Sequence, residues 1–355
     1  MKGTNEENEQ TTPRKPRTKE PWELELEKIV EKVAPGNKPG HTAVVMNIFR
    51  TAMKLAKESP GTLNLKITAT TLNELRASFR TFSPHRQSPK ITMFGSARVP
   101  AKTPLYEFTK DFAAQAVKRK FLVITGGGPG IMAAGNEGAE KGGFGLNIRL
   151  PFEQSANPFI DHETMLVNYK YFFTRKLFLV KEAWAFAFFP GGFGTFDEAF
   201  EVLTLLQTGK TNLIPVVLLE PPRFGYWKSF MEFVKKGLLK HRFIGESDLS
   251  LFKVFTNSKD AIEHIEHFYR IYHSMRFVGR KLVLRIKKPL SAKLLADLND
   301  KFGELTDGEI AQTDALPEED NEPAHKDLTR LVFSFDRQDY GKLRRLIDYI
   351  NDKAI

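Results

Sequence analysis

The sequence has no cysteine among its 355 residues, which excludes disulfide bonds and thiol chemistry. No apolar run approaches the roughly 20 residues that cross a bilayer, so we expect no contact with a membrane. The polar N-terminus lacks the apolar core of a secretion signal. Because missing cysteines identify no compartment, we expect the cytoplasm by default.

Several common catalytic patterns are missing as well. The histidines show no H-x-x-x-H spacing, which argues against a structural or catalytic metal. There is no G-x-S-x-G nucleophile motif, and no lysine stands in a context typical of a Schiff base. The sequence therefore predicts no metal and no cofactor, and it disfavours a pyridoxal-phosphate decarboxylase.

The charge is moderately positive, with 53 Lys and Arg against 43 Asp and Glu, a net +10 that fits an anionic ligand. The densest basic stretch, residues 14–19, lies in a Pro- and Thr-rich segment that also carries acids. We expect residues 1–21 to form a disordered tail. Contact with nucleic acid is the minor alternative for this tail, and we predict no nucleic-acid partner.

The remaining sequence divides into three regions with different residue patterns. Residues 22–89 show helical periodicity broken by Pro-Gly pairs, which predicts a helical N-terminal extension. Residues 90–273 alternate short apolar strands with helices of about 10–15 residues, which is typical of an α/β, Rossmann-like, doubly wound parallel sheet. Residues 274–355 follow a βαββα order, which predicts a small α+β domain of ferredoxin-like, regulatory or oligomerising type.

A glycine-rich turn is the most informative feature. The apolar run 183–189 ends at Pro190, and P-G-G-F-G-T-F-D-E then leads to Glu198 at the start of a helix expected over residues 195–208. Such a turn directs unpaired backbone N–H groups and the positive end of the helix dipole to one place. The turn therefore predicts an anion site, and Glu198 is available for chemistry beside a bound phosphate.

A simpler interpretation exists for the same residues. Thr195 and Glu198 fit a capping box, in which Thr195 caps the helix and Glu198 bonds back to the cap N–H. A cap does not need three preceding glycines, and glycine is costly unless φ is positive or a ligand approaches the backbone. The glycines favour a ligand, while capping by Glu198 stays open.

A second glycine-rich turn lies upstream and also follows an apolar strand. The apolar run 121–124 leads into T-G-G-G-P-G at residues 125–130. Ile131 rules out the dinucleotide fingerprint, and no G-K-[ST] of a P-loop follows. A third turn is possible at residues 95–98. Because ligands of open α/β sheets bind outside the carboxyl ends of strands, the turns predict a shared crevice for phosphate and ribose.

A basic pair, Arg175 and Lys176, begins the helix that precedes the strand of residues 183–189. A cation at a helix N-terminus is electrostatically unfavourable, which indicates an anionic partner. The alternative is an ordinary exposed basic pair.

Together these residues resemble the LOG family. Its members are Rossmann-like nucleotide 5′-monophosphate nucleosidases that include cytokinin-activating phosphoribohydrolases and were long mislabelled lysine decarboxylases. The resemblance rests on G-G-G-P-G-I-M from residue 126, G-L-N-I with L-P from residue 145, the Arg-Lys pair at 175, and P-G-G-F-G-T with Glu198. It covers about residues 90–240, and the additional ends are more like the larger bacterial members.

The resemblance implies hydrolysis of nucleoside 5′-monophosphates, such as AMP or cytokinin riboside monophosphates, to a free base and ribose 5-phosphate. It implies Glu198 and Arg175 as the catalytic pair. The residues that would bind phosphate and ribose are Gly127, Gly128, Gly191, Gly192, Gly194, Thr195, Ser96 and Lys176. A homodimer or higher homo-oligomer is expected from the family. The alternative is a non-catalytic nucleotide- or cofactor-binding sensor or carrier, because molybdenum-cofactor carriers share the fold.

Overall fold

The computed structural model describes residues 20–34, 39–58, 60–150, 155–319 and 322–354. By internal contacts the chain divides into two units, Met1–Thr70 and Thr71–Ile355. Residues 1–19 of the expected disordered tail, with the basic stretch 14–19, lie outside the described residues. The last residue of that segment, Pro21, already begins helix α1.

The first unit is helical, as predicted. It contains α1 (Pro21–Val33), α2 (Pro39–Glu58) and the beginning of α3 (Thr62–Phe82). Within it, Arg50 Nε donates to Glu23 Oε1 at 2.5 Å, which ties α2 to α1.

The second unit is built around a parallel sheet, which confirms the predicted α/β class. Within the described ranges it has seven strands in the order β4-β3-β2-β1-β5-β6-β7. They are β1 (Lys90–Phe94), β2 (Leu122–Thr125), β3 (Gly143–Ile148), β4 (Leu166–Tyr169), β5 (Ala185–Phe188), β6 (Val216–Leu219) and β7 (Lys253–Phe255). The chain winds outward in both directions from β1 and β5, so a ligand-binding switch point is expected between these two strands.

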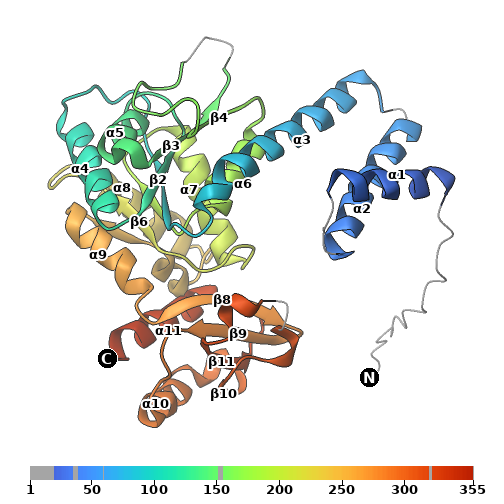
Figure 1. Ribbon diagram of the computed structural model, residues 1–355. Helices are drawn as coiled ribbons and strands as arrows, with labels where there is room; N and C mark the ends of the chain where they lie inside the picture. Colours follow the sequence, from blue (N-terminus) through green and yellow to red (C-terminus); the bar gives the residue numbers. More distant parts are fainter. Residues whose placement is uncertain (1–19, 35–38, 59, 151–154, 320–321, 355) are drawn as a thin grey trace, which may run out of the picture. The chain divides into compact units, whose positions relative to one another are not determined.

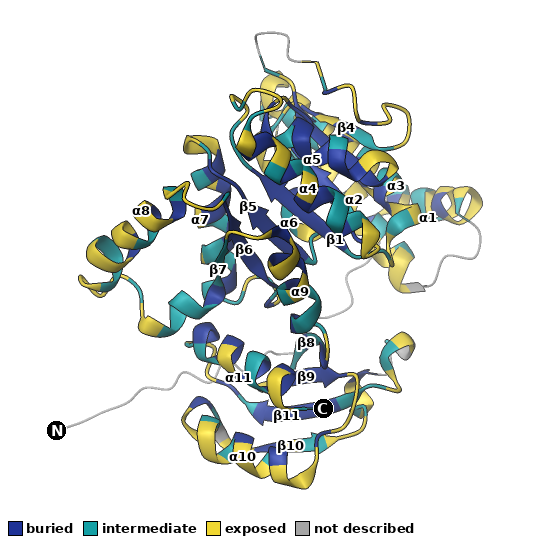
Figure 2. Cartoon of the chain, turned by 90° about the vertical axis from the view of Figure 1, so that its left-hand side faces the viewer, coloured by how far each residue is buried: buried dark blue, intermediate teal, exposed yellow. Residues whose placement is uncertain are grey.

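Helices cover both faces of this sheet (Figure 1). They are α4 (Pro104–Lys118), α5 (Ile131–Ala139), α6 (Phe172–Lys181), α7 (Phe193–Gln207), α8 (Tyr226–Phe233, continued as a π-helix over Val234–Leu239) and α9 (Ser258–Phe268). Alternate residues of one strand enter opposite cores: Ala187 packs with α4 and α9, whereas Phe186 packs with α6 and α7. The central strands are therefore buried on both sides, as their dark colour in Figure 2 shows.

The C-terminal part is a four-stranded antiparallel sheet, in the order β10-β11-β9-β8 within the described ranges, with two helices. Its elements are β8 (Tyr272–Val278), β9 (Lys281–Ile286), α10 (Ala292–Phe302), β10 (Asp307–Thr313), β11 (Thr329–Ser334) and α11 (Tyr340–Lys353). β8 precedes the predicted βαββα order and pairs with β9. The strands β7 and β8 and the helix α9 were not predicted from the sequence.

Two features are absent from the part of the chain that the structure describes. No helix there is long and apolar enough to cross a membrane. No group of three or more His, Asp and Glu side chains there is arranged to hold a metal ion.

Candidate active site

A cavity of about 740 Å³ opens beyond the carboxyl ends of β1, β2 and β5. Each of these strands runs into one of the three turns predicted from the sequence. Seven of the ten predicted site residues line the cavity: Ser96, Gly128, Arg175, Gly192, Gly194, Thr195 and Glu198. The other three, Gly127, Gly191 and Lys176, lie outside the lining.

Helix α7 begins two residues earlier than predicted. Its first residue is Phe193, its N-cap is Gly192, and no side chain caps it. Thr195 N donates to the carbonyl oxygen of Gly192 at 3.0 Å, so Thr195 lies inside the first turn. The capping-box interpretation is therefore wrong, because Glu198 lies in the second turn, beyond the third helical position that such a box requires.

Glycine stands at the positions of this turn for two different reasons. A Cβ atom on Gly191 would collide with Thr195 Oγ1 and come within 2.9 Å of Ser96 N, so packing requires glycine there. A Cβ atom on Gly192 or Gly194 would meet nothing within 4 Å. Since neither residue has a positive φ, the fold itself does not explain glycine at these two positions. A ligand lying close to the backbone N–H groups does explain it.

Side-chain hydrogen bonds hold the glycine-rich turn at residues 125–130 in place. Gly127 has φ +74° and donates its N–H to Thr125 Oγ1 at 3.0 Å. The side-chain amide of Asn157 donates to the carbonyl oxygens of Gly127 and Gly128, both at 3.1 Å. Gly127 therefore shapes the turn, and Gly128 lines the cavity. Asn157 was not predicted, because a buried asparagine in a loop of turn residues has no sequence signature.

Glu198 is the buried acid of the cavity, only 5% exposed. Burial raises the pKa of Glu198 to about 7, against the opposing attraction of Lys176 and Arg175. Its nearest ion-pair partner is Lys176 Nζ, 3.8 Å from Oε2. A carboxyl group that titrates near neutral pH can accept or orient a proton during a reaction.

Arg175 lies on α6 and reaches the first glycine turn. A Cβ atom on Gly126 would come within 3.2 Å of Arg175 Nη2, and the guanidinium lies 5.7 Å from the ring of Phe172. Burial lowers the pKa of Arg175 below its ordinary value. Its Nε is buried without a hydrogen-bond partner among the described residues, which is unusual and indicates an acceptor supplied by a ligand.

Both members of the catalytic pair that the resemblance implies, Arg175 and Glu198, line the cavity. Among the described residues no ion pair within 4 Å joins them. Lys176 contacts the acids of α7 instead, with Nζ 2.7 Å from Glu201 and 2.9 Å from Asp197. Lys176 thus links α6 to α7 through ion pairs. The charge of Arg175, which lines the cavity, remains available to a ligand.

A carboxylate that the sequence did not reveal positions the start of α6. Glu74 of α3 is buried, and its Oε1 accepts the N–H of Lys170 at 2.6 Å. Its Oε2 accepts the hydroxyl of Thr174, the residue before Arg175. Because these partners lie about a hundred residues apart in the chain, no local motif could have identified Glu74.

Comparisons with known proteins agree with the resemblance. The family model described as "Possible lysine decarboxylase" matches residues 127–265. LOG2 of Arabidopsis thaliana, a cytokinin riboside 5′-monophosphate phosphoribohydrolase, is 29% identical over 152 residues, which is 42% of this chain and 70% of that protein. LOG3 of the same plant, with the same named activity, is 24% identical over 185 residues, 50% of this chain and 82% of that protein.

Solved structures give weaker likenesses. The molybdenum cofactor binding protein of Rippkaea orientalis aligns with a TM-score of 0.38 and 17% identity, over 51% of this chain and 96% of that one. A molybdenum cofactor carrier protein of Chlamydomonas reinhardtii gives 0.35 and 19%, over 50% and 96%. The seven-stranded parallel sheet itself shows the α/β fold. The family model and the curated relatives together support the LOG family for residues 127–265 of this chain.

Proposed function

We propose that this protein hydrolyses the N-glycosidic bond of nucleoside 5′-monophosphates and releases the free base and ribose 5-phosphate. One observation carries the proposal: a buried carboxyl group, Glu198, with its pKa raised to about 7, lines the same cavity as the uncapped start of α7. The phosphoribohydrolase names of the curated relatives support this reaction class.

The substrate's phosphate is expected at the start of α7. The N–H groups in the first turn of a helix have no intrahelical acceptor, and the glycines at 192 and 194 leave their backbone open. Arg175 supplies positive charge and an unpartnered buried donor. The apolar lining residues Met132 and Ile148 offer a surface for the base.

The reaction breaks the bond between C1′ and the base nitrogen, and the base leaves with the electron pair. The transition state has oxocarbenium character, by analogy with O-glycoside cleavage. In our proposal Glu198, as a carboxylate, orients the attacking water and stabilises the cationic sugar. The water oxygen bonds to C1′, and its proton ends on the departing base. Phosphate binding remote from this bond contributes positioning.

The ionised form of Glu198 makes activity depend on pH. Because burial raises the pKa of Glu198 to about 7, kcat/KM should rise with pH and level off above about 7. The second ionisation of a substrate phosphate, at a pKa of about 6, lies lower and can be resolved from it. The measurement is a kcat/KM profile from pH 5 to 9. A profile that falls between pH 6 and 8 would show that the protonated acid is the active form.

Two glycine substitutions separate ligand binding from folding. Gly194→Ala should leave the free energy of unfolding unchanged or raise it by up to about 1 kcal/mol, because alanine favours helix and meets no neighbour. It should nevertheless weaken AMP binding about tenfold or more, since the methyl group lies where the phosphate approaches. Gly191→Ala must displace Thr195 and should lose about 1–3 kcal/mol of stability. Denaturant titration and calorimetry measure both effects, and unchanged AMP affinity in Gly194→Ala would contradict the phosphate position.

Chromatography provides the direct test of the function. Purified protein is incubated with AMP, GMP, CMP, UMP and a cytokinin riboside monophosphate, and free base is measured. We expect release of base from at least one of them. Binding without release would instead support the sensor or carrier alternative. Cytoplasmic location, assembly into a homodimer or higher homo-oligomer, and the boundaries at residues 89 and 273 stay predictions.

A further inference from the structure

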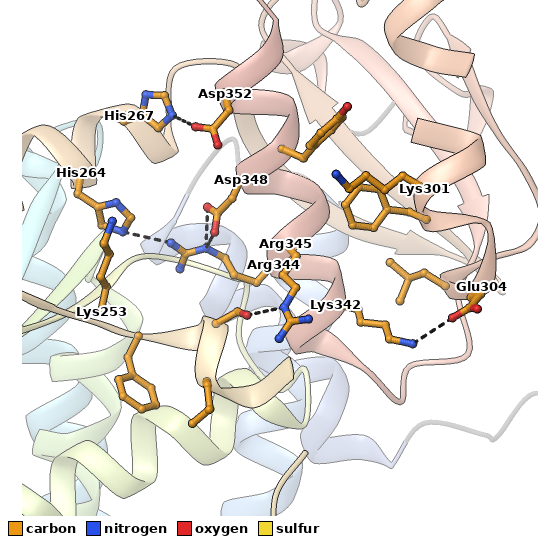
Figure 3. Close-up of a pocket in the computed structure, with 16 residues that line it drawn as sticks. Lys253, His264, His267, Lys301, Glu304, Lys342, Arg344, Arg345, Asp348 and Asp352 are labelled. Carbon is orange, nitrogen blue, oxygen red and sulfur yellow. Dashed lines mark hydrogen bonds and ion pairs between the residues drawn. The ribbon is translucent and has the colours of Figure 1, made fainter. Parts of the chain in front are cut away.

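A second cavity, of about 790 Å³, lies in the second unit between the parallel sheet and the C-terminal α+β part (Figure 3). On one side it is lined by the turn η4 (Glu246–Leu251), β7 and α9, and on the other by α10 and α11. Its residues are distinct from those of the candidate active site. Its volume is within the range of about 300–1,000 Å³ that small-molecule sites occupy.

The lining is rich in cations. Among the described residues it has five lysine and arginine side chains against three carboxylates: Lys253, Lys301, Lys342, Arg344 and Arg345, with Glu304, Asp348 and Asp352.

Every one of these carboxylates already has a partner. Glu304 lies 3.6 Å from Lys342 Nζ, Asp348 accepts from Arg344 at 2.9 Å, and Asp352 lies 2.7 Å from His267. The carboxylates therefore leave part of the positive charge in the lining uncompensated.

Three cations have no carboxylate partner in the part of the chain that the structure describes. Lys253 and Lys301 contact only aromatic rings, those of Phe255 at 5.4 Å and Tyr349 at 4.6 Å. Arg345 donates to two neutral acceptors on η4, a serine hydroxyl at 2.7 Å and a backbone carbonyl at 3.0 Å. These three charges come from both sides of the cavity, so an anion bound between the two sides would compensate the charges on each side.

One residue of the lining, Arg344, holds its guanidinium in a fixed position. Arg344 is only 3% exposed, lies 4.5 Å from the ring of Phe268, and is held by Asp348. Its Nη2 lies 3.3 Å from Nε2 of His264, and Figure 3 shows the guanidinium between these two partners. Burial, followed by Arg344 and Lys253, lowers the pKa of His264 to about 3, so His264 is a neutral acceptor. Nη1 of Arg344 has no partner among the described residues and remains available to a ligand.

We propose that this cavity binds a small molecule with two or more neighbouring anionic groups, phosphates or carboxylates, between Lys253 on one side and Lys301, Arg344 and Arg345 on the other. Phosphate and carboxylate groups both present a pair of oxygen atoms that can accept two parallel N–H bonds from a guanidinium. Phe252 and Phe302 of the lining offer contact to the apolar remainder of the ligand.

The position of the cavity connects it to helix α7. A Cβ atom on Gly341 of α11 would collide with the backbone of Ser247 in η4, so these two elements touch directly. Gln207, the last residue of α7, donates to Asp248 of η4 at 2.7 Å. A ligand that holds α11 against η4 therefore acts on the helix that carries Glu198. This consequence for activity rests on the proposed function, whereas the binding itself does not.

Calorimetry on the full chain tests the binding. The probes are inorganic pyrophosphate, tripolyphosphate and citrate, which distinguish phosphate from carboxylate ligands. We expect at least one probe to bind the wild type, and the double variant Lys253→Gln/Lys301→Gln to bind it at least tenfold more weakly. The variant Lys235→Gln/Lys240→Gln removes the same charge from exposed positions outside the cavity and should bind like the wild type.

Two results would overturn the site: no binding of any probe to the wild type, or equal weakening in both double variants. Gly194→Ala should keep the probe affinity, because that residue lies in the other cavity. Without probe, the Lys253→Gln/Lys301→Gln variant should release base from AMP at the wild-type rate. If neither the wild type nor any variant releases base but the probe still binds, the proposed function is contradicted and the anion site is not.

Discussion

Glu198→Gln is expected to lower kcat for base release from AMP by about 100- to 10,000-fold, while the dissociation constant for AMP changes little. Glutamine preserves the size of the side chain but cannot orient water as a carboxylate or stabilise a cationic sugar. The phosphate contacts at the start of α7 stay intact. The measurements are kcat by chromatography and affinity by calorimetry. Near-full activity in the variant would remove Glu198 from the mechanism.

Glu201→Gln is the matched control. Glu201 is one turn further along α7, also contacts Lys176, and is one-third exposed, but it lies outside the cavity. Its replacement should change kcat less than about threefold, since exposed ion pairs contribute about 0–1 kcal/mol. A loss equal to that of Glu198→Gln would point to Lys176 rather than to the buried acid.

The stability of Glu198→Gln should rule out unfolding as the cause of lost activity. The pKa of Glu198 is raised from 4.5 to about 7 by burial, so the protonated form is favoured in the fold. The stability it contributes is fully present below pH 4.5 and is lost as the pH rises through about 7. Glutamine carries no such dependence, so the variant should be more stable than the wild type at pH 8, by at most about 3 kcal/mol. Lower stability at pH 8 would contradict this assignment.

Glu319→Gln is expected to lower the free energy of unfolding by about 3–5 kcal/mol. Glu319 ends the short helix η6 (Pro317–Glu319) and is 3% exposed. Its Oε1 accepts from Arg285 Nε and its Oε2 from Arg330 Nε, both at 2.9 Å, and both arginines are buried. Removing the carboxylate leaves the buried Arg330 without a carboxylate partner among the described residues and leaves Arg285 with Glu322 alone, 2.7 Å from its Nη2. Leaving a buried charge uncompensated costs more than the pair itself contributes. Denaturant unfolding followed by circular dichroism measures the loss.

Glu318→Gln provides the control, because Glu318 is the adjacent acid and is exposed. It should change stability by less than about 0.5 kcal/mol. Burial alone would raise the pKa of Glu319, but hydrogen bonds from Arg330 and Arg285 lower it to about 2. The stability it contributes is present above pH 4.5 and is lost as the pH falls toward 2, a dependence that Glu319→Gln should lack. Equal unfolding energies for the two variants would show that the arginines find other partners.

The strands and turns around the candidate site were predictable because their signals are local. Apolar runs that end at glycine-rich turns mark the carboxyl ends of β2 and β5, and both turns line the cavity. The strand β7 was not predictable, since its three residues begin with an exposed lysine and gain their order from pairing with β6. The strand β8 mixes polar and apolar residues and is likewise specified by its partner, β9.

The start of α7 shows where local preference fails. Threonine and glycine are about equally good N-caps, but only Thr195 precedes a glutamate at the capping-box distance. The helix nevertheless begins at Phe193. The residues before it are held by other parts of the chain: Ser96 N–H donates to the carbonyl oxygen of Pro190 at 3.1 Å, and Tyr226 Oη donates to that of Gly191 at 2.6 Å. These are contacts between segments, which the local sequence does not reveal, and with the helix starting at Phe193 Glu198 lies in the second turn.

The sequence by itself determined the chemistry available to this protein: glycine turns after buried strands, one acid and a basic pair beside them, and neither cysteine nor a metal-binding pattern. Only the tertiary structure decided how these groups act. Burial sets the pKa of Glu198 near 7, Lys176 rather than Arg175 lies next to it, and Glu74 holds the start of α6. Desolvation and pairing depend on distances between segments far apart in the chain, and a linear sequence does not contain those distances.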